Sequence, residues 1–93
     1  MKLIVPKVVN LGILGKGKHT GVIQIQALDN VEITHVSASC GCTVPNVRTP
    51  FTLVKDEIKN IEFSANAGKV PWRKKLTIIT KENETYGVEL QID

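Results

Sequence analysis

The sequence predicts an all-β protein, an immunoglobulin-like β-sandwich of about seven antiparallel strands, from three observations. Val, Ile and Thr make up 29 of the 93 residues (11, 10 and 8), and β-branched side chains fit a pleated sheet better than a helix. Seven Gly and four Pro are spread along the chain, as expected of turns between short strands. Strand-like segments recur about every 8–12 residues, without a helical period.

The predicted strands begin with residues 3–5 and 8–14, one edge strand broken by Pro6, which cannot donate to a ladder. A glycine-rich turn over 15–21 separates it from a strand over 22–28. In that strand Ile23, Ile25 and Ala27 alternate with polar residues, which is typical of a half-buried strand. The remaining strands are expected at 31–39, at 58–64, and at 72–80 and 85–92 as a terminal hairpin.

Two segments depart from regular alternation. Apolar residues occupy odd positions at the start of 31–39 and even positions at its end, which predicts a β-bulge near Thr34–His35 or a strand covered on both faces. Residues 43–52 contain Pro45 and Pro50. We expect this segment to be an irregular connection between the sheets.

Size and composition restrict the function. Ninety-three residues form one domain, residues 1–93. The net charge is only +3, and the four aromatic residues are scattered, whereas nucleic-acid binders concentrate positive charge and aromatic side chains. No set of residues resembles a catalytic constellation. We therefore expect no enzyme, no cofactor, no small-molecule substrate and no nucleic-acid partner.

The N-terminus does not resemble a signal peptide, because Pro6, Lys7 and Asn10 interrupt its apolar run and no small-residue cleavage site follows. No window approaches the roughly 18 apolar residues of a membrane span. We therefore expect a protein made in the cytoplasm, without a membrane partner.

The order of these signals resembles a known family. A strand ending in Leu-Gly, a glycine-rich turn, Val-Ile-Gln-Ile, Ser-Cys-Gly-Cys-Thr-Val-Pro, Ile-Glu-Phe and a final hairpin follow one another. This order is similar to that of a bacterial and phage immunoglobulin-like family of unknown function, related to Hydin-type domains, over about Val8 to Ile92. The resemblance implies a non-enzymatic module. By analogy it also implies accessory proteins of phage virions, although fold does not fix function.

Cys40 and Cys42, the only cysteines, are candidates for chemistry. Residues i and i+2 of a strand lie about 6.5–7 Å apart at Cα, near the upper limit for a disulfide, so a disulfide would need a local turn at Gly41. A closed zinc site takes four ligands, and His19 and His35 are the only histidines. The sequence favours reduced, packed structural thiols, with a strained disulfide and a metal site as alternatives.

A second set of residues is a candidate for partner contact, because basic side chains lie near turns and large aromatics dominate interface energetics. The alternative interpretation is that the charges blunt a solvated edge and that the tryptophan belongs to the core, as its even position alongside Leu76 and Ile78 suggests. The candidates are Lys16, Lys18, His19, Trp72, Arg73, Lys74 and Lys75.

The function expected from the sequence is structural or protein-binding. Its most specific form is an accessory or decoration protein of a phage virion, with capsid or tail subunits as partners and the virion as its location. The alternatives are a small thiol-redox or metal-handling protein using Cys40 and Cys42, and an exported assembly or adhesion module.

Overall fold

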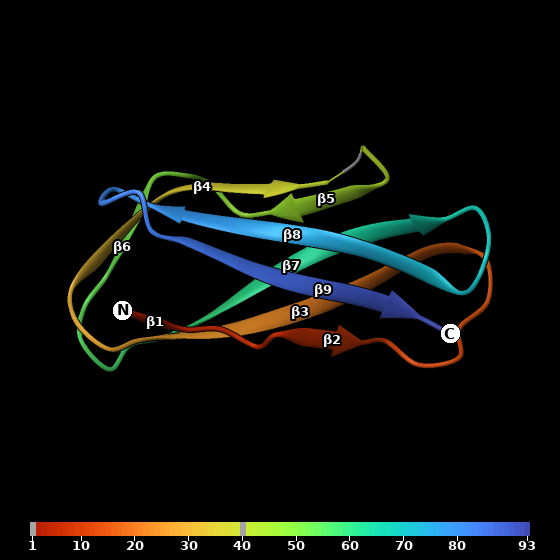
Figure 1. The fold of residues 1–93 in the computed structure, drawn as a ribbon, viewed down its shortest axis with the longest axis horizontal. Coiled ribbons are helices and arrows are strands. Elements are labelled where there is room, and N and C mark those ends of the chain that lie inside the picture. The colour runs from red at the N-terminus through yellow and green to blue at the C-terminus, as the bar shows by residue number, and fades with distance from the viewer. Residues whose placement is uncertain (1, 40) are drawn as a thin grey trace.

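Two β-sheets packed face to face form the part of the chain that the computed structural model describes, residues 2–39 and 41–93 (Figure 1). The four-stranded sheet has the order β1 (Leu3–Ile4), β3 (Gly17–Ala27), β7 (Ile58–Ala67) and β5 (Thr43–Asn46). The five-stranded sheet has the order β2 (Val8–Asn10), β9 (Thr85–Ile92), β8 (Trp72–Thr80), β4 (Val31–Ala38) and β6 (Phe51–Leu53). The predicted all-β, immunoglobulin-like sandwich is therefore confirmed.

The core lies between the sheets and follows the period of two. Ile23, Ile25 and Ala27 of β3 are fully buried, as the alternation predicts. In β7, Ile61 lies opposite Ile23 and Phe63 lies opposite Gly21, and both are buried, since residues two apart in a strand face the same side. The five-stranded sheet contributes Ile33, Leu76, Ile78, Val88, Leu90 and Ile92.

The predicted bulge in β4 is present. The pairing of β4 with β8 shifts between Ile33 and His35. The extra residue lets Val31 and Ile33 face the core before the bulge and Val36 pack against it afterwards, because a bulge changes which face successive side chains point to.

Three boundaries differ from the sequence-based expectation. The segment 43–52 contains two short strands, β5 and β6. Pro45 is tolerated in β5 because β5 lies at the edge of its sheet, where a residue without an N–H costs no hydrogen bond. The turn expected over 15–21 is shorter, because β7 extends to Ala67 and pairs with β3 from Gly17.

The predicted N-terminal edge strand is also divided, with its halves in different sheets. β1 pairs antiparallel with β3, whereas β2 pairs parallel with β9. No helix among the described residues is long and apolar enough to cross a membrane.

Candidate functional site

Trp72 belongs to the core, and its prediction as a contact residue is wrong. Its exposed fraction is 5%, and its even position places it on the inner face of β8 with Leu76 and Ile78. A side chain buried to this extent offers no surface to a partner.

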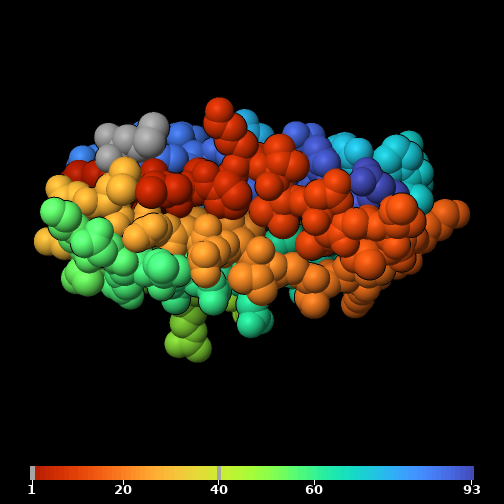
Figure 2. All heavy atoms as spheres, turned by 90° about the horizontal axis from the view of Figure 1, so that it is seen from below, coloured from red at the N-terminus to blue at the C-terminus, as the bar shows by residue number. Residues whose placement is uncertain are grey.

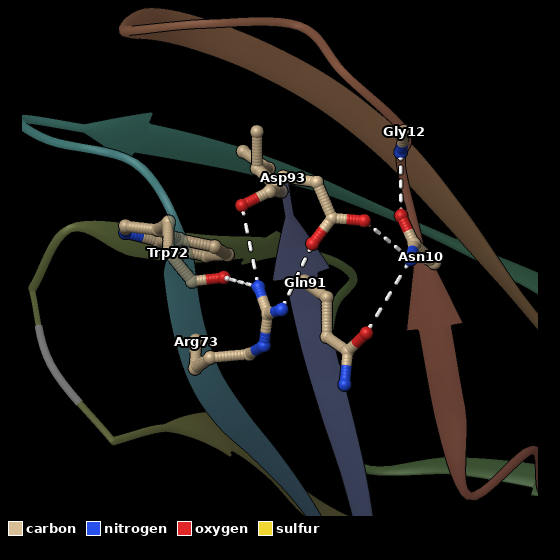
Figure 3. Close-up of polar contacts among 7 residues, drawn as sticks. Asn10, Gly12, Trp72, Arg73, Gln91 and Asp93 are labelled. Carbon is tan, nitrogen blue, oxygen red and sulfur yellow. Dashed lines mark hydrogen bonds and ion pairs between the residues drawn. The ribbon is translucent and has the colours of Figure 1, made fainter.

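Arg73 faces outward, but it is engaged within the chain (Figure 3). Its guanidinium donates to the carbonyl oxygens of Trp72 at 3.0 Å and Ile92 at 3.3 Å, and to Asp93 Oδ1 at 2.8 Å. The contacts tie the start of β8 to the end of β9.

Asp93 is also bound from β2. Asn10 Nδ2 donates to Asp93 Oδ2 at 3.0 Å, and Asn10 Oδ1 accepts from the backbone N–H of Gly12 at 2.7 Å (Figure 3). The hydrogen bond from Asn10 and then that from Arg73 lower the pKa of the Asp93 carboxyl, because both favour its charged form. This cluster is a structural clasp.

The other predicted contact residues have different surroundings. Lys16 and Lys18 are exposed. His19 is half-buried, and its Nε2 lies 3.0 Å from the carbonyl oxygen of Gly15, to which it donates. Lys74 is half-buried, and Lys75 is exposed.

The structure brings the start of β3 and the start of β8, which carry these predicted contact residues, to one end of the sandwich, the right-hand end in Figure 1. At this end the N–H of Asp93 donates to the carbonyl oxygen of Gly12 at 2.9 Å. The predicted contact residues do not form one surface there, however. Lys18 points outward from the four-stranded sheet, whereas Arg73 and Lys75 point outward from the five-stranded sheet.

Cys42 is disulfide-bonded, so the expected reduced thiol is wrong at this position. Its Sγ lies 3.9 Å from Thr43 Oγ1. Cys40, the other cysteine of the chain, lies outside the described residues. No group of three or more His, Cys, Asp or Glu that could hold a metal occurs in the described part of the chain.

The outer face of the four-stranded sheet is a surface that the sequence-based interpretation missed. Its apolar members Ile4, Val22, Val44 and Ile58 are each about half exposed. The other outward side chains of β3 and β7 are amides and hydroxyls, with Lys18 and Glu62 as the charged exceptions. The available signal was Val22, an apolar residue at a position whose neighbours Gln24 and Gln26 face water.

Two shallow hollows lie on this face, over β3, β7 and β5. One, of about 330 Å³, is lined in part by Thr20, Val22, Asn46, Glu62 and Ser64. The other, of about 460 Å³, is lined by Lys18, Gly41, Cys42, Val44, Ser64 and Asn66. Each hollow is thus lined by hydroxyl, amide and apolar groups together with one charged side chain, Glu62 in the first and Lys18 in the second.

Solved structures share this fold. A protein of unknown function from Porphyromonas gingivalis W83 aligns with a TM-score of 0.82 and 9% identity, over 99% of this chain and 46% of its own. The secreted serine protease VesC from Vibrio cholerae aligns with a TM-score of 0.74 and 16% identity, over 99% of this chain and 23% of its own.

A Bacteroides ovatus GH5 xyloglucanase aligns with a TM-score of 0.62 and 10% identity, over 98% of this chain and 18% of its own. The chain thus spans less than half the length of each of these proteins. At such identities the likeness shows the fold alone.

The comparison with curated proteins gives no match. Residues 15–93 match the model of a family described as "Protein of unknown function (DUF1573)". The match begins at Gly15, before β3, and runs through all the later strands. The chain therefore belongs to the DUF1573 family of proteins of unknown function.

Proposed function

We propose that this chain is a non-enzymatic protein-binding module, whose contact surface is the outer face of the four-stranded sheet. The carrying observation is the set of half-exposed apolar residues Ile4, Val22, Val44 and Ile58 among polar side chains of which only Lys18 and Glu62, on β3 and β7, are charged. The centres of protein interfaces are depleted of charged residues, and β3 and β7 contribute only two charged side chains to this face, Lys18 and Glu62. The partner it fits is a protein surface that is similarly apolar and poor in charged side chains.

The five-stranded sheet differs on its outer face. Arg73, Lys75 and Glu89 point outward there, and Arg73 is held by Asp93. Exposed ion pairs of this kind contribute little net energy, and a partner would have to desolvate them. This contrast favours the four-stranded sheet.

A matched pair of valines tests the proposal. Val44 on β5 and Val54 in the β6–β7 turn are 57% and 59% exposed, so an aspartate at either position costs the folded chain little. The chain carrying a photo-crosslinking residue at Val22 is exposed to extract of the source organism, and the crosslinked protein is identified by mass spectrometry. We expect Val44→Asp to weaken binding of that protein and Val54→Asp to leave it unchanged. Equal binding by both variants would contradict the proposal.

The more specific hypothesis is that the partner belongs to a phage particle, as a capsid or tail subunit. It is supported by the sequence resemblance and by the small sandwich with a polar and apolar contact face. Mass spectrometry of purified particles tests it. Absence of the chain from particles, together with no binding to any virion component, would reject this version without rejecting a protein partner.

The disulfide at Cys42 favours a second candidate, an exported assembly or adhesion module. Disulfides persist mainly in oxidising compartments, and VesC, one of the proteins sharing the fold, is described as secreted. Fractionation of the source cells tests location. Labelling with iodoacetamide before and after reduction tests the thiols: labelling only after reduction supports the exported candidate. Labelling of unreduced protein would instead favour the thiol-redox alternative.

A further inference from the structure

One flank of β3, the side facing away from β7, is free over most of its length. β7 pairs with β3 from Gly17 to Gln26, but β1 pairs with it only at Gln26 and Ala27. Figure 2 looks onto this side, where the orange atoms of β3 lie open next to the red N-terminal segment. Nine residues, Gly17 to Ile25, therefore have a strand on one side only.

The hydrogen bonds at the end of β3 show which backbone groups face the free flank. The N–H of Ala27 donates to Glu57, toward β7, and the N–H of Leu28 donates to Lys2, toward β1. Because successive backbone groups of a strand point to alternate sides, odd residues of β3 face β7 and even residues face the flank. The flank groups are those of Lys18, Thr20, Val22 and Gln24.

The other free flanks in the described part of the chain are shorter. β1, β2 and β6 have two or three residues, and β5 contains Pro45. The free stretches of β4, β7, β8 and β9 are 35–38, 58–61, 72–75 and 85–88. Proteins protect sheet edges with short strands, prolines, bulges and charges. The free stretch of β3 contains no proline, and its one charged residue, Lys18, lies near its end, so Thr20 to Ile25 have neither charge nor proline.

We infer that this flank pairs with the same flank of a second copy of the chain. The two β3 strands run antiparallel about a two-fold axis at Gly21, and their pairing joins the two four-stranded sheets into one. Such a contact uses the same patch on both partners. Centring it on Gly21 sets even residues opposite even residues, so the flank-facing groups of the two strands meet. The inference concerns the edge of the sheet, and it goes beyond the face proposed above for a partner.

The side chains are compatible with this register. Lys18 lies opposite Gln24, and Thr20 lies opposite Val22, so no like charges face each other across the new pair. At the axis the two Gly21 residues present no side chains. The fold already holds β3 extended through β7, so a second copy pairs without the ordering entropy that a flexible peptide would lose. This favours self-pairing over capture of a disordered segment.

Residue-resolved amide hydrogen exchange of the whole chain, measured by NMR at increasing concentration, tests the inference. At low concentration the amides of Thr20, Val22 and Gln24 should exchange fast, and those of Ile23 and Ile25 slowly. Exchange of the first group should slow about tenfold when nine in ten chains are paired, while sedimentation shows the mass doubling.

Three results would overturn the inference: flank amides that stay fast while the mass stays monomeric, flank amides protected in a dilute monomer, or a dimer whose flank amides remain fast.

Variants separate self-pairing from the proposed partner binding. Val22→Pro removes an N–H that faces only the flank, so it should abolish pairing while the monomer stays folded. Val22→Thr keeps the N–H and should pair normally. If Val22→Pro alters the circular dichroism spectrum, Thr20→Lys replaces it, because the two introduced lysines become diagonal neighbours across the axis and repel each other, whereas Lys18 lies opposite Gln24. Val44→Asp, on the far edge of the sheet, should leave self-pairing intact even where it abolishes binding of the partner.

Discussion

Gly21 leaves space for the ring of Phe63. A Cβ at this position would lie 2.5 Å from Phe63 Cζ and 2.8 Å from Leu11 Cδ2, and Phe63 is buried, so the core would have to shift. We expect Gly21→Ala to lower the free energy of unfolding by about 1–3 kcal/mol, the usual cost of overpacking. Urea denaturation followed by circular dichroism measures it.

Gly87 is the control for this substitution. A Cβ there would lie 2.5 Å from Lys75 Cε, near the end of an exposed, flexible side chain that can move aside. Gly87→Ala should therefore change stability by less than about 0.5 kcal/mol. An equal loss in both variants would show that backbone preference, and not the contact with Phe63, determines the cost.

The carboxyl of Asp93 links stability to pH. Its pKa is lowered in the folded state, first by Asn10 and then by Arg73. A group with a depressed folded pKa stabilises the protein above its unfolded pKa, about 4 for Asp, and the contribution is lost as the pH falls through the folded value. We expect Asp93→Asn to flatten the fall in melting temperature below about pH 4.

Asn10→Ala separates the causes of this dependence. If the hydrogen bond from Asn10 is the main cause, Asn10→Ala should reduce the fall in melting temperature below about pH 4. Arg73→Lys should change this fall less. An identical fall in Asn10→Ala and the unchanged chain would contradict the assignment.

Residue patterns predicted burial better than they predicted polar partners. The even position of Trp72 already indicated the core. In contrast, the partners of Arg73 follow from the β8–β9 register, which sets Arg73 opposite Gln91 and so brings Ile92 and Asp93 within reach. A contact nearly twenty residues away in sequence is not visible in local spacing.

Within β8, the burial of Trp72 gives a spectroscopic prediction. It is the single tryptophan of the chain, and it lies among core side chains. We expect blue-shifted fluorescence that iodide quenches weakly, and a red shift with stronger quenching in denaturant. Strong quenching of the native protein would contradict its place in the core.

Strands with regular alternation were predicted well, and short edge strands were not. The bounds of β8 and β9 follow from the alternation of apolar residues. The bulge in β4 follows from the switch of apolar residues from odd to even positions. β5 and β6 have three or four residues with prolines in or beside them, and only pairing with β7 and β4 makes them strands. Local sequence has no signal for such pairing.

The first fourteen residues join both sheets of the molecule. Leu3 is buried in the core, and β1 and β2 each cover an edge of a different sheet. Deleting residues 1–14 should cost about 2–5 kcal/mol for loss of a buried leucine alone, and it should promote association by exposing all of β3. Thermal denaturation and light scattering measure these effects. A truncated chain as stable as the whole would show that the core closes without β1.

The overall sandwich was predictable because its core follows from alternation in five long strands. The assignment of strands to sheets was not, since the break at Pro6 does not say that the chain changes sheet there. The contact face was missed for a related reason. Val22, Val44 and Ile58 lie on three different strands, and only the pairing of β3, β7 and β5 brings them onto one face.

The parallel pairing of β2 with β9 has a mechanical consequence. The two ends of the chain lie at opposite ends of the sandwich (Figure 1), and β2 and β9 are bonded side by side near the N- and C-terminal ends of the chain. A force that pulls these ends apart loads the bonds between the two strands in shear, together rather than one after another. We expect single-molecule stretching to give a distinct rupture peak, which Leu11→Pro lowers by removing the backbone N–H that donates to the carbonyl oxygen of Gln91 next to β2. A chain that extends without a peak would show that the two strands separate before they bear load.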